Sequence, residues 1–532
     1  MEHFRIWQVS REYAGIAEAG GVKNVTTSLC EELSRQGHEV LFFIPLYGCT
    51  CFDSVEKYEK NFVPKVAVTV CGKAHDIAFD RGFCNGVTII FVKHQSFAEK
   101  NGVYTYTVED EKKVASHVHG TGFSDALFLN TLFQKAVLAF SEVCDYQAPD
   151  ILHCQDATTA LIPAFLQAFS QSPENPQKKF FAKTKCVVTV HNAGAGYHHH
   201  FSNIGEAAWF TELPTEMLEK AVVYGTVEPF LLSSQNAVLT TVSPSYAKEL
   251  LNPNNEATGG LSRAFYEKKI KIIGITNGID FDRYNPEHTE ISLLPFAFAP
   301  EKGQLLGKYH CRQKFLEEYV NPDFPVPAPI IRYGHIDLGL ASDVSEPVYV
   351  GFHGRLVSQK GIDILVGAAD EILKNDSAVR FIFIGHGEAR IESALAELSE
   401  KYAGKCVYFK GYDRALSRLC TAVSDFIALP SCFEPCGLED FIAQIYGSVP
   451  VAHATGGLNK IIDGQTGFLY SPNTVEKLTE KLREVIKIKQ EHSEAFRNMI
   501  STAANYVHKM YSWSAVCRDS YLPLYRKLLH NR

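Results

Sequence analysis

The sequence predicts an α/β protein with two Rossmann-like domains that face each other across a cleft. Short apolar runs alternate with amphipathic stretches through the N-terminal half, which is the pattern of parallel βαβ units. The same alternation begins again after Glu346-Pro347. Several apolar runs end in small or polar loops, and open α/β sheets bind ligands at the carboxyl ends of their strands. We therefore expect the ligand site at strand ends.

The elements of the N-terminal half follow one another in a regular order. A strand is predicted at 6–9, and the Gly20-Gly21 loop then leads into an amphipathic helix over 25–36. Further buried strands are predicted at 40–44, 151–153, 186–190 and 238–242. Because parallel strands need crossover connections between them, this order predicts the first Rossmann-like domain.

The second half repeats the pattern. A strand is predicted at 348–352, followed by a loop from Gly354 to Gly361, a helix over 362–374 and a strand at 381–385. The tail from 473 to 529 contains little Gly or Pro and is predicted to be helical.

The proline-dense segment 325–329 predicts an irregular connector between the two halves. We expect four regions: a first domain at 1–286, a connector at 287–346, a second domain at 347–500, and helices at 501–532 that close onto the first domain.

Composition and charge exclude several classes of protein. Of the 532 residues, 46% are hydrophobic and 21% are charged, which is ordinary for a folded chain of more than one domain. The net charge of −8 offers no basic face to nucleic acid. No window reaches the ~20 apolar residues of a membrane span, and the first residues lack a basic, apolar leader. We expect neither nucleic acid nor a membrane as a partner.

Cysteine and histidine usage gives no metal signal. The fourteen cysteines form no CxxC pair, and several lie in apolar runs. We expect reduced, buried thiols in a cytoplasmic protein that needs no cofactor. The run His198-His199-His200 is predicted to be a surface loop, because adjacent side chains do not converge on one ion in regular structure.

Three loops carry residues suited to an anionic sugar ligand. Arg355 and Lys360 follow the strand at 348–352, and an Arg fork with a Lys point charge can neutralise a diphosphate. On its own this pattern also fits an ordinary solvated loop, and the same holds for Glu434 in the loop 430–438. The segment Thr455-Gly456-Gly457 offers backbone N–H groups that suit phosphate.

The sequence motifs of these loops resemble those of bacterial glycogen synthases and plant starch synthases. The string FEPCGL, followed at the family's distance by TGGL, resembles the donor-sugar loop, and RLVSQKG resembles the family's RLxxQKG motif. VHN, TVSPSYA and TNGID in the first half resemble further family motifs, as does the YSW string with the C-terminal tyrosines. The resemblance covers most of the chain and is thinnest at roughly 50–120 and 287–346.

This resemblance implies a GT-B fold and a retaining glucosyltransferase. The enzyme would extend an α-1,4-glucan from a nucleotide sugar, ADP-glucose in the first instance, and would do so without a metal. The residues implied to be catalytic are Glu434, Arg355, Lys360, His191 and Asp156. The residues implied to bind the donor nucleotide are Gly20, Gly21, Lys23, Asn277, Gly354, Tyr412, Cys436, Gly437, Leu438, Thr455, Gly456 and Gly457.

The chain departs from the family pattern at several places. Glu18 stands where the family has a phosphate-contacting Lys, so either Lys23 supplies the charge or Glu18 points away. Asn24 and Asp440 replace an Asp and a Gln, and the family's HDWH appears as the CQDAT string at 154–158. These departures keep two alternatives open. One is a transferase for another sugar nucleotide or acceptor, and the other is a catalytically weak glucan-binding homologue.

Overall fold

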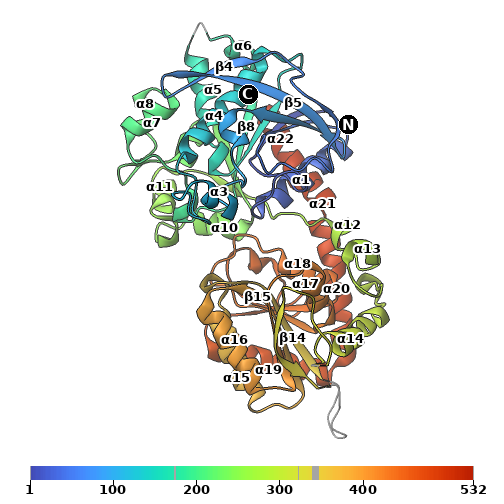
Figure 1. Ribbon diagram of the computed structural model, residues 1–532. Coiled ribbons are helices and arrows are strands. Elements are labelled where there is room, and N and C mark those ends of the chain that lie inside the picture. Colours follow the sequence, from blue (N-terminus) through green and yellow to red (C-terminus); the bar gives the residue numbers. More distant parts are fainter. Residues whose placement is uncertain (1, 173–174, 322, 338–346, 531–532) are drawn as a thin grey trace. The chain divides into compact units, whose positions relative to one another are not determined.

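The computed structural model describes residues 2–172, 175–321, 323–337 and 347–530. They form two compact units, each described here by itself (Figure 1). Unit 1 contains the chain up to Gly278 together with the segment from Trp513 onward, and unit 2 is Ile279–Ser512. Over the described ranges, no helix is both long enough and apolar enough to cross a membrane.

Unit 1 is built on a mainly parallel sheet. The strands follow the order β12-β11-β8-β7-β1-β2-β6 in parallel, and the sheet continues through antiparallel β5 and β3, with β4 paired to β5. The strand bounds are β1 Arg5–Val9, β2 Glu39–Pro45, β3 Glu56–Glu59, β4 Val66–Val70, β5 Lys73–Cys84, β6 Val87–Lys93, β7 Ile151–Gln155, β8 Lys185–Val190, β11 Ala237–Thr241 and β12 Ile272–Gly274. A separate hairpin joins β9 Val222–Val223 to β10 Thr226–Val227.

Helices cover this sheet, and the C-terminal segment is one of the covering layers. The helix bounds are α1 Val22–Arg35, α2 Gln95–Ala98, α3 Val108–Lys113, α4 Ala126–Ala139, α5 Ile162–Gln171, α6 Gln177–Phe180, α7 Ile204–Thr211, α8 Thr215–Glu219, α9 Pro229–Ser233, α10 Pro244–Leu250, α11 Leu261–Glu267, α21 Trp513–Val516 and α22 Leu522–His530. Val25, Leu29 and Leu33 repeat every four residues on one face of α1, and they share a buried core with Tyr521 and Tyr525. The tail therefore folds with the N-terminal unit.

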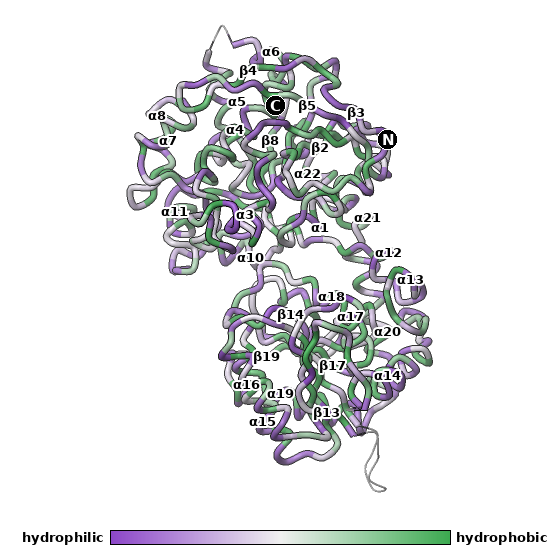
Figure 2. Tube along the Cα trace, in the orientation of Figure 1, coloured by the Kyte–Doolittle hydropathy of each residue, from purple (hydrophilic) through white to green (hydrophobic). Residues whose placement is uncertain are grey.

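Unit 2 is a second parallel sheet. Its strand order is β13-β16-β15-β14-β17-β18-β19, and only β13 runs antiparallel to its neighbour in the described sheet. The strand bounds are β13 Ile331–Ile336, β14 Val348–Leu356, β15 Val379–Gly387, β16 Lys405–Lys410, β17 Phe426–Leu429, β18 Val449–His453 and β19 Phe468–Tyr470. All four residues of β17 are buried apolar side chains, so this stretch is strongly hydrophobic in Figure 2. A strand buried on both faces suits a parallel sheet with helices on either side.

The helices of unit 2 follow the expected βαβ order. Their bounds are α12 Phe281–Tyr284, α13 Thr289–Ser292, α14 Leu306–Glu318, α15 Ile362–Leu373, α16 Ala389–Lys401, α17 Arg414–Val423, α18 Glu439–Ile445, α19 Val475–Glu491 and α20 Ser493–Tyr511. The helical tail predicted from 473 onward is thus present. It continues in unit 2 through Tyr511, so the chain passes to unit 1 after Ser512 and not near residue 500.

The stretch 287–346 differs from the irregular connector that its prolines suggested. It contains α14 and β13, and β13 is an edge strand paired to β16 from Ile331 to Ile336. The dense prolines lie only in the loop before β13, where a missing N–H costs no ladder bond. Cys311 and Phe315 of α14 are buried in the core of the unit, so the helix is part of its fold. Residues 338–346 lie outside the described part.

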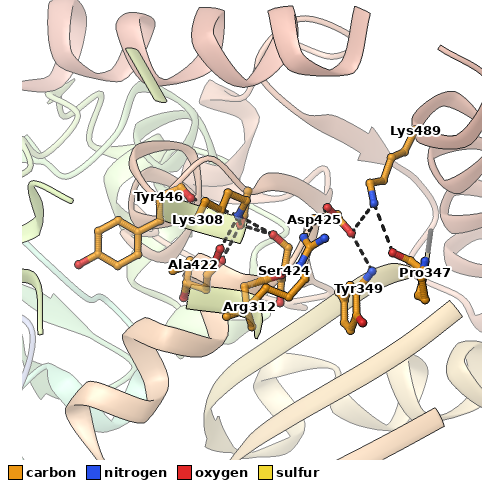
Figure 3. Close-up of polar contacts among 12 residues, drawn as sticks. Lys308, Arg312, Pro347, Tyr349, Ala422, Ser424, Asp425, Tyr446 and Lys489 are labelled. Carbon is orange, nitrogen blue, oxygen red and sulfur yellow. Dashed lines mark hydrogen bonds and ion pairs between the residues drawn. The ribbon is translucent and has the colours of Figure 1, made fainter. Parts of the chain in front are cut away.

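A buried lysine fixes α14 to the rest of unit 2 (Figure 3). Nζ of Lys308 donates to the carbonyl oxygens of Ala422 and Ser424 at 2.6 and 2.7 Å, and to Oγ of Ser448 at 2.9 Å. The last carbonyls of a helix have no partner within the helix. Lys308 thus donates to oxygens at the end of α17, and Oγ of Ser448 donates to the carbonyl oxygen of Ser424 as well, at 2.7 Å.

One turn further along α14, a carboxylate joins three elements. Arg312 pairs with Asp425 at 2.7 Å, and Lys489 of α19 reaches the same carboxylate at 2.9 Å (Figure 3). Burial raises the pKa of Asp425, but the neighbouring Arg312 and Lys489 outweigh this and leave the pKa below its usual value. The cluster therefore holds the start of β17 between α14 and α19.

Candidate functional site

A pocket of about 300 Å³ opens at the carboxyl ends of the central strands of unit 2. Gly354 and Arg355 lie in the last three residues of β14, Gly385 and His386 in the last three of β15, and Leu429 ends β17. Parallel strands bring their carboxyl ends to one edge, so three loops that are far apart in sequence line one cavity. Other lining residues are Phe352, His353, Lys360, Ile384, Gly411, Tyr412, Ser417, Ser431, Glu434, Gly437, Leu438, Glu439 and Leu458.

Lys360 and Glu434 form an ion pair at the wall of this pocket. Nζ of Lys360 lies 2.5 Å from Oε2 of Glu434, which also accepts a hydrogen bond from Oγ of Ser431 at 3.2 Å. Both charged side chains are largely buried. The pair orients the carboxylate and leaves the pocket with one neutralised cation at this position.

Arg355 presents the pocket with an unneutralised cation. The residue is exposed, and its guanidinium makes no hydrogen bond or ion pair with any residue that the structure describes. Two other residues that line the pocket form a second pair, in which Nε2 of His353 lies 3.1 Å from Oε2 of Glu439. Burial lowers the pKa of His353, but the Glu439 carboxylate outweighs burial and the net pKa is raised. The site therefore combines a free guanidinium with two ion pairs, a charge pattern suited to a ligand that carries phosphate.

The loops that make the pocket are held together by close backbone contacts. The amide of Cys432 donates to the carbonyl oxygen of Gln359 at 2.9 Å. A Cβ at Gly361 would lie 2.0 Å from the carbonyl oxygen of Pro430, and one at Gly456 would lie 2.1 Å from that of Glu434. Only glycine permits such approaches. The RLVSQKG, FEPCGL and TGGL segments therefore form one packed unit.

The Thr455-Gly456-Gly457 segment supports the pocket from behind and does not line it. The amide of Gly457 donates to the carbonyl oxygen of Glu434 at 2.7 Å, and that of Thr455 donates to the carbonyl oxygen of His453 at 2.8 Å. These amides are thus engaged with the chain itself. Of these amides, that of Gly457 holds the Glu434 loop, and the role of the segment in binding phosphate stays a prediction. Cys436 likewise lies outside the pocket lining.

Asp440 is paired with a lysine that the sequence gave no reason to select. Nζ of Lys460 lies 2.9 Å from Oδ1 of Asp440 and also donates to the carbonyl oxygen of Gly437 at 3.0 Å. Both side chains are buried. Burial raises the pKa of Asp440 to about 6, against the opposing effect of Lys460. The departure at this position is therefore compensated locally, by a cation on the following loop.

Unit 1 places His191 at the end of β8, where it continues a buried chain of hydrogen bonds. Nε2 of His191 lies 2.8 Å from Oε1 of Gln155, and Nε2 of Gln155 donates to Oε1 of Gln8 at 3.0 Å. Gln8 in turn contacts His153, which bonds to the hydroxyl of Tyr525 at 2.8 Å. Burial lowers the pKa of His191 to about 4, so the ring is neutral at physiological pH.

Asp156 lies beside His191 in an unusual backbone conformation. Its φ of 67° is in a region that few non-glycine residues adopt. Its Oδ1 accepts a bond from the amide of His191 at 3.3 Å. Burial raises the pKa of Asp156 to about 7. The structure therefore brings these two predicted residues together, with the carboxyl group holding the histidine loop.

The Gly20-Gly21 loop is occupied in part by the chain's own carboxylates. The amides of Ala19 and Gly20 donate to Oε2 of Glu12 at 2.9 and 2.6 Å. Nζ of Lys23 lies 2.6 Å from the Glu18 carboxylate. The lysine that could supply a charge to the loop and the glutamate that replaces the family's Lys therefore neutralise each other. Helix α1 starts at Val22, and Gly21 supplies no side-chain cap to the amides of its first turn.

Two further predictions concern buried residues of unit 1. Asn277 is buried, and its Oδ1 has no hydrogen-bond partner among the described residues. The surface-loop prediction for the histidine run is wrong at His198. That side chain is buried, with Nε2 2.8 Å from the carbonyl oxygen of Ala193 and Nδ1 3.3 Å from Glu228. The next residue, His199, has a φ of 49°, in the left-handed region.

Comparison with known proteins places this site in a family. The family model described as starch synthase catalytic domain matches residues 5–265, and the one described as glycosyl transferases group 1 matches residues 347–487. The glycogen synthase of Thermodesulfovibrio yellowstonii is 32% identical, over 98% of this chain and 98% of its own length. The chain belongs to the glycogen synthase family.

Another glycogen synthase and two solved structures extend the match. The glycogen synthase of Photobacterium profundum is 27% identical over 98% of this chain and 94% of its own length. The solved catalytic domain of starch synthase IV from Arabidopsis thaliana, described as bound to ADP and acarbose, has a TM-score of 0.77 at 25% identity and covers 99% of this chain and 100% of that one. The sucrose-phosphate synthase of Thermosynechococcus elongatus, at a TM-score of 0.55 and 16% identity over 99% and 100% of the two chains, shares the fold. The predicted GT-B fold class, family and glucan-extending glucosyltransferase activity are confirmed.

Within this glycogen synthase framework, the structure separates the predicted residues into groups. Gly354, Arg355, Lys360, Tyr412, Glu434, Gly437 and Leu438 line the pocket of unit 2, while Cys436, Thr455, Gly456 and Gly457 are not among its lining residues. His191 and Asp156 form their own group in unit 1. Sequence reasoning missed Glu12, Gln155 and Lys460. A glutamate six residues before Glu18 carried no signal of its own, because its role depends on how the loop folds back.

Proposed function

We propose that this protein transfers glucose from ADP-glucose to the end of an α-1,4-glucan, with retention of configuration. The observation that carries the proposal is the pocket of unit 2, where Arg355, Lys360 and Glu434 meet at the carboxyl ends of the strands. Three oxygen- or nitrogen-bearing groups of this kind match a ligand that is anionic at one end and a sugar at the other. The Arabidopsis relative described with bound ADP supports an adenine nucleotide as the donor.

The two cations give the pocket its proposed catalytic role. When the bond between the anomeric carbon and the diphosphate breaks, negative charge develops on the departing oxygen. Arg355, which is free, and Lys360, which is held by Glu434, can stabilise this charge in a site that needs little reorganisation. Meanwhile the 4-hydroxyl of the acceptor bonds to the same carbon on the same face, and its proton passes to the diphosphate. Glu434 is proposed to bind the glucosyl ring.

The residues of unit 1 have proposed supporting roles. His191 is neutral, and its Nε2 is committed to Gln155, so the ring can offer Nδ1 to a sugar hydroxyl. Asp156 fixes the amide of His191 and so positions the loop. The first turn of α1, with Gly21 and Lys23, is proposed to contact the donor phosphates.

A second candidate is a transferase for another sugar nucleotide or acceptor. The observation that favours it is the Glu18–Lys23 pair, which cancels a charge next to the Gly20-Gly21 loop. A catalytically weak glucan-binding protein is disfavoured by the Lys460–Asp440 pair, since the altered residue there is compensated and the pocket remains intact. The fourteen cysteines are all free thiols, which supports a reducing compartment and the cytoplasm as the site of action.

The deciding experiment measures incorporation of labelled glucose into glycogen. The full chain is incubated with glycogen and either ADP-glucose or UDP-glucose, with Arg355→Ala as the matched inactive control. We expect incorporation from ADP-glucose that is far faster than from UDP-glucose. Incorporation from UDP-glucose alone would replace the donor assignment with the second candidate. Glycogen binding without incorporation from either nucleotide would overturn the proposed activity.

A further inference from the structure

Three side chains outside the proposed transfer site converge in unit 1. They are His198, His200 and Glu228, and one ligand atom from each lies within 4.8 Å of the others. Glu228 follows the β9–β10 hairpin and starts α9, while the two histidines belong to the loop that follows β8. None of the three takes part in the reaction proposed above.

Backbone pairing explains why these residues meet. Phe201 and Val227 form an antiparallel bridge, with N–H to O distances of 3.0 and 2.9 Å in the two directions. In an antiparallel pair, the residue before one partner lies opposite the residue after the other, so His200 lies opposite Glu228. The amide of Glu228 also donates to the carbonyl oxygen of Ala221 at 3.0 Å, which fixes its position at the hairpin end.

The separations fit a bound ion better than a direct hydrogen bond. Nδ1 of His198 is 3.3 Å from both carboxylate oxygens of Glu228, and Nδ1 of His200 is 3.9 Å from Oε1. A charge-assisted N–H to carboxylate bond is normally about 2.7–2.9 Å long, so 3.3 Å is too long for a buried pair of this kind. Two ligands that each lie ~2.0–2.1 Å from one tetrahedral ion are about 3.4 Å apart.

The hydrogen bonding around the cluster also points to an ion. Nε2 of His198 lies 2.8 Å from the carbonyl oxygen of Ala193, and a ring that donates there directs the lone pair of Nδ1 toward Glu228. Metal-binding histidines commonly use their second nitrogen in this way. Glu228 is only 3% exposed, and its Oε2 makes no hydrogen bond within the described structure, since Nδ1 of His198 lies at the long distance of 3.3 Å from it. A buried carboxylate oxygen without a donor calls for a cation.

We infer that His198, His200 and Glu228 bind a divalent transition-metal ion, with Zn²⁺ as the best match. Two imidazole nitrogens and one carboxylate are a ligand set that Zn²⁺ accepts, with water in the fourth position. The ion would join the loop after β8 to the β9–β10 hairpin, as a structural crosslink. Because Ala193 follows His191 by two residues, the crosslink would also restrain the loop that carries His191.

The test measures metal binding and not transfer, so its outcome is independent of the proposed function. The full chain, prepared without an affinity tag, is stripped with EDTA, dialysed and exposed to ZnCl₂. Bound metal is then measured by mass spectrometry after gel filtration, and melting is followed with and without zinc. We expect about one zinc per chain and a Tm higher by several degrees. Cobalt substitution should give the intense visible absorption of a tetrahedral site.

Variants of the same run of histidines supply the controls. His200→Ala removes a half-exposed ligand and leaves His198 and Glu228 in contact, so the fold should survive while zinc binding falls at least tenfold. His199→Asn, which keeps a residue tolerant of the left-handed conformation, should bind zinc as the natural chain does. Wild type that retains no zinc, or zinc retained equally by His200→Ala, would overturn the inference and leave His198 and Glu228 as a metal-free buried pair.

Discussion

The ammonium of Lys360 lies 2.5 Å from the carboxylate of Glu434, although 74 residues separate them in the chain. One residue comes from the loop after β14 and the other from the loop after β17. This pair orients Glu434 and partly neutralises Lys360. Arg355, which has no such partner in the described structure, is therefore the stronger of the two cations toward an incoming diphosphate.

We expect Arg355→Ala and Lys360→Ala each to lower glucosyl transfer by about 100- to 1,000-fold, because each removes a preorganised charge from the developing anion. Steady-state kinetics with ADP-glucose measure the loss, and melting curves show that the variants are folded. Arg390→Ala removes an exposed arginine that does not line the pocket and should have little effect. Near-normal turnover in the folded double variant would contradict the assignment.

The Glu18–Lys23 pair should tune donor binding in opposite directions. Glu18→Gln releases the Lys23 charge and should tighten ADP-glucose binding, while Lys23→Met leaves the Glu18 anion and should weaken it. Both side chains are partly exposed, so each effect stays within ~1 kcal/mol, or about fivefold in affinity. The double variant should return close to wild type.

Donor titration calorimetry on all four forms checks this cycle, with Glu480→Gln as a control from an exposed pair on α19. An unchanged affinity in both single variants would show that the Gly20-Gly21 loop does not contact the donor. That half of the predicted site would then be wrong.

The buried histidine at the centre of unit 1 should make the fold sensitive to acid. Burial, helped by the nearby His191, lowers the pKa of His153 to about 3. A neutral histidine whose folded pKa is depressed contributes stability above about pH 6.5, and this is lost as pH falls toward 3. Wild type should therefore lose ~1.4 kcal/mol of unfolding free energy per pH unit below 6.5, relative to His153→Gln.

Urea unfolding of both proteins between pH 7 and pH 5 measures this difference. His492→Gln, which changes an exposed histidine, should follow wild type across the same range. Parallel pH profiles for wild type and His153→Gln would show that His153 does not titrate between the folded and unfolded states as inferred.

Lys308 should be a major contributor to the stability of unit 2. Lys308→Met leaves the oxygens of Ala422, Ser424 and Ser448 buried without this donor, and we expect a loss of about 3 kcal/mol in unfolding free energy. Lys314→Met on the same helix changes an exposed side chain and should alter stability by less than about 0.5 kcal/mol. Denaturant melts compare them, and equal effects from the two would contradict a specific role for Lys308.

Local patterns were sufficient to predict the two α/β units and their strands. The run 426–429 reads as a buried strand and is β17, and the glycine loop before 25–36 precedes α1. The periodicity of apolar residues and the residues that favour turns are set over a few neighbouring positions. Both can therefore be recognised without knowing the rest of the fold. They failed at 287–346, where proline density masked α14 and β13. The edge strand β13 is stabilised by pairing with β16, a segment some seventy residues away.

The family motifs also come from the sequence alone, because Arg355, Lys360 and Glu434 lie in short strings that can be read in order. What the sequence could not supply is the set of partners that these loops acquire. Glu12 binds the amide of Gly20, Lys460 binds Asp440, and Glu228 meets His198. Each contact joins residues whose neighbours in sequence carry no shared pattern.

The sequence by itself thus determined the fold class, the family and the strand ends where the donor pocket lies. The tertiary structure alone decided which of the nearby charges are free and which are neutralised. The physical reason is that a charge's effect depends on its distance to the next charge and on its burial, and parallel crossovers set both. Arg355 and Lys360 are five residues apart in sequence. The fold pairs Lys360 with Glu434, whereas Arg355 lines the pocket without such a pair in the described structure.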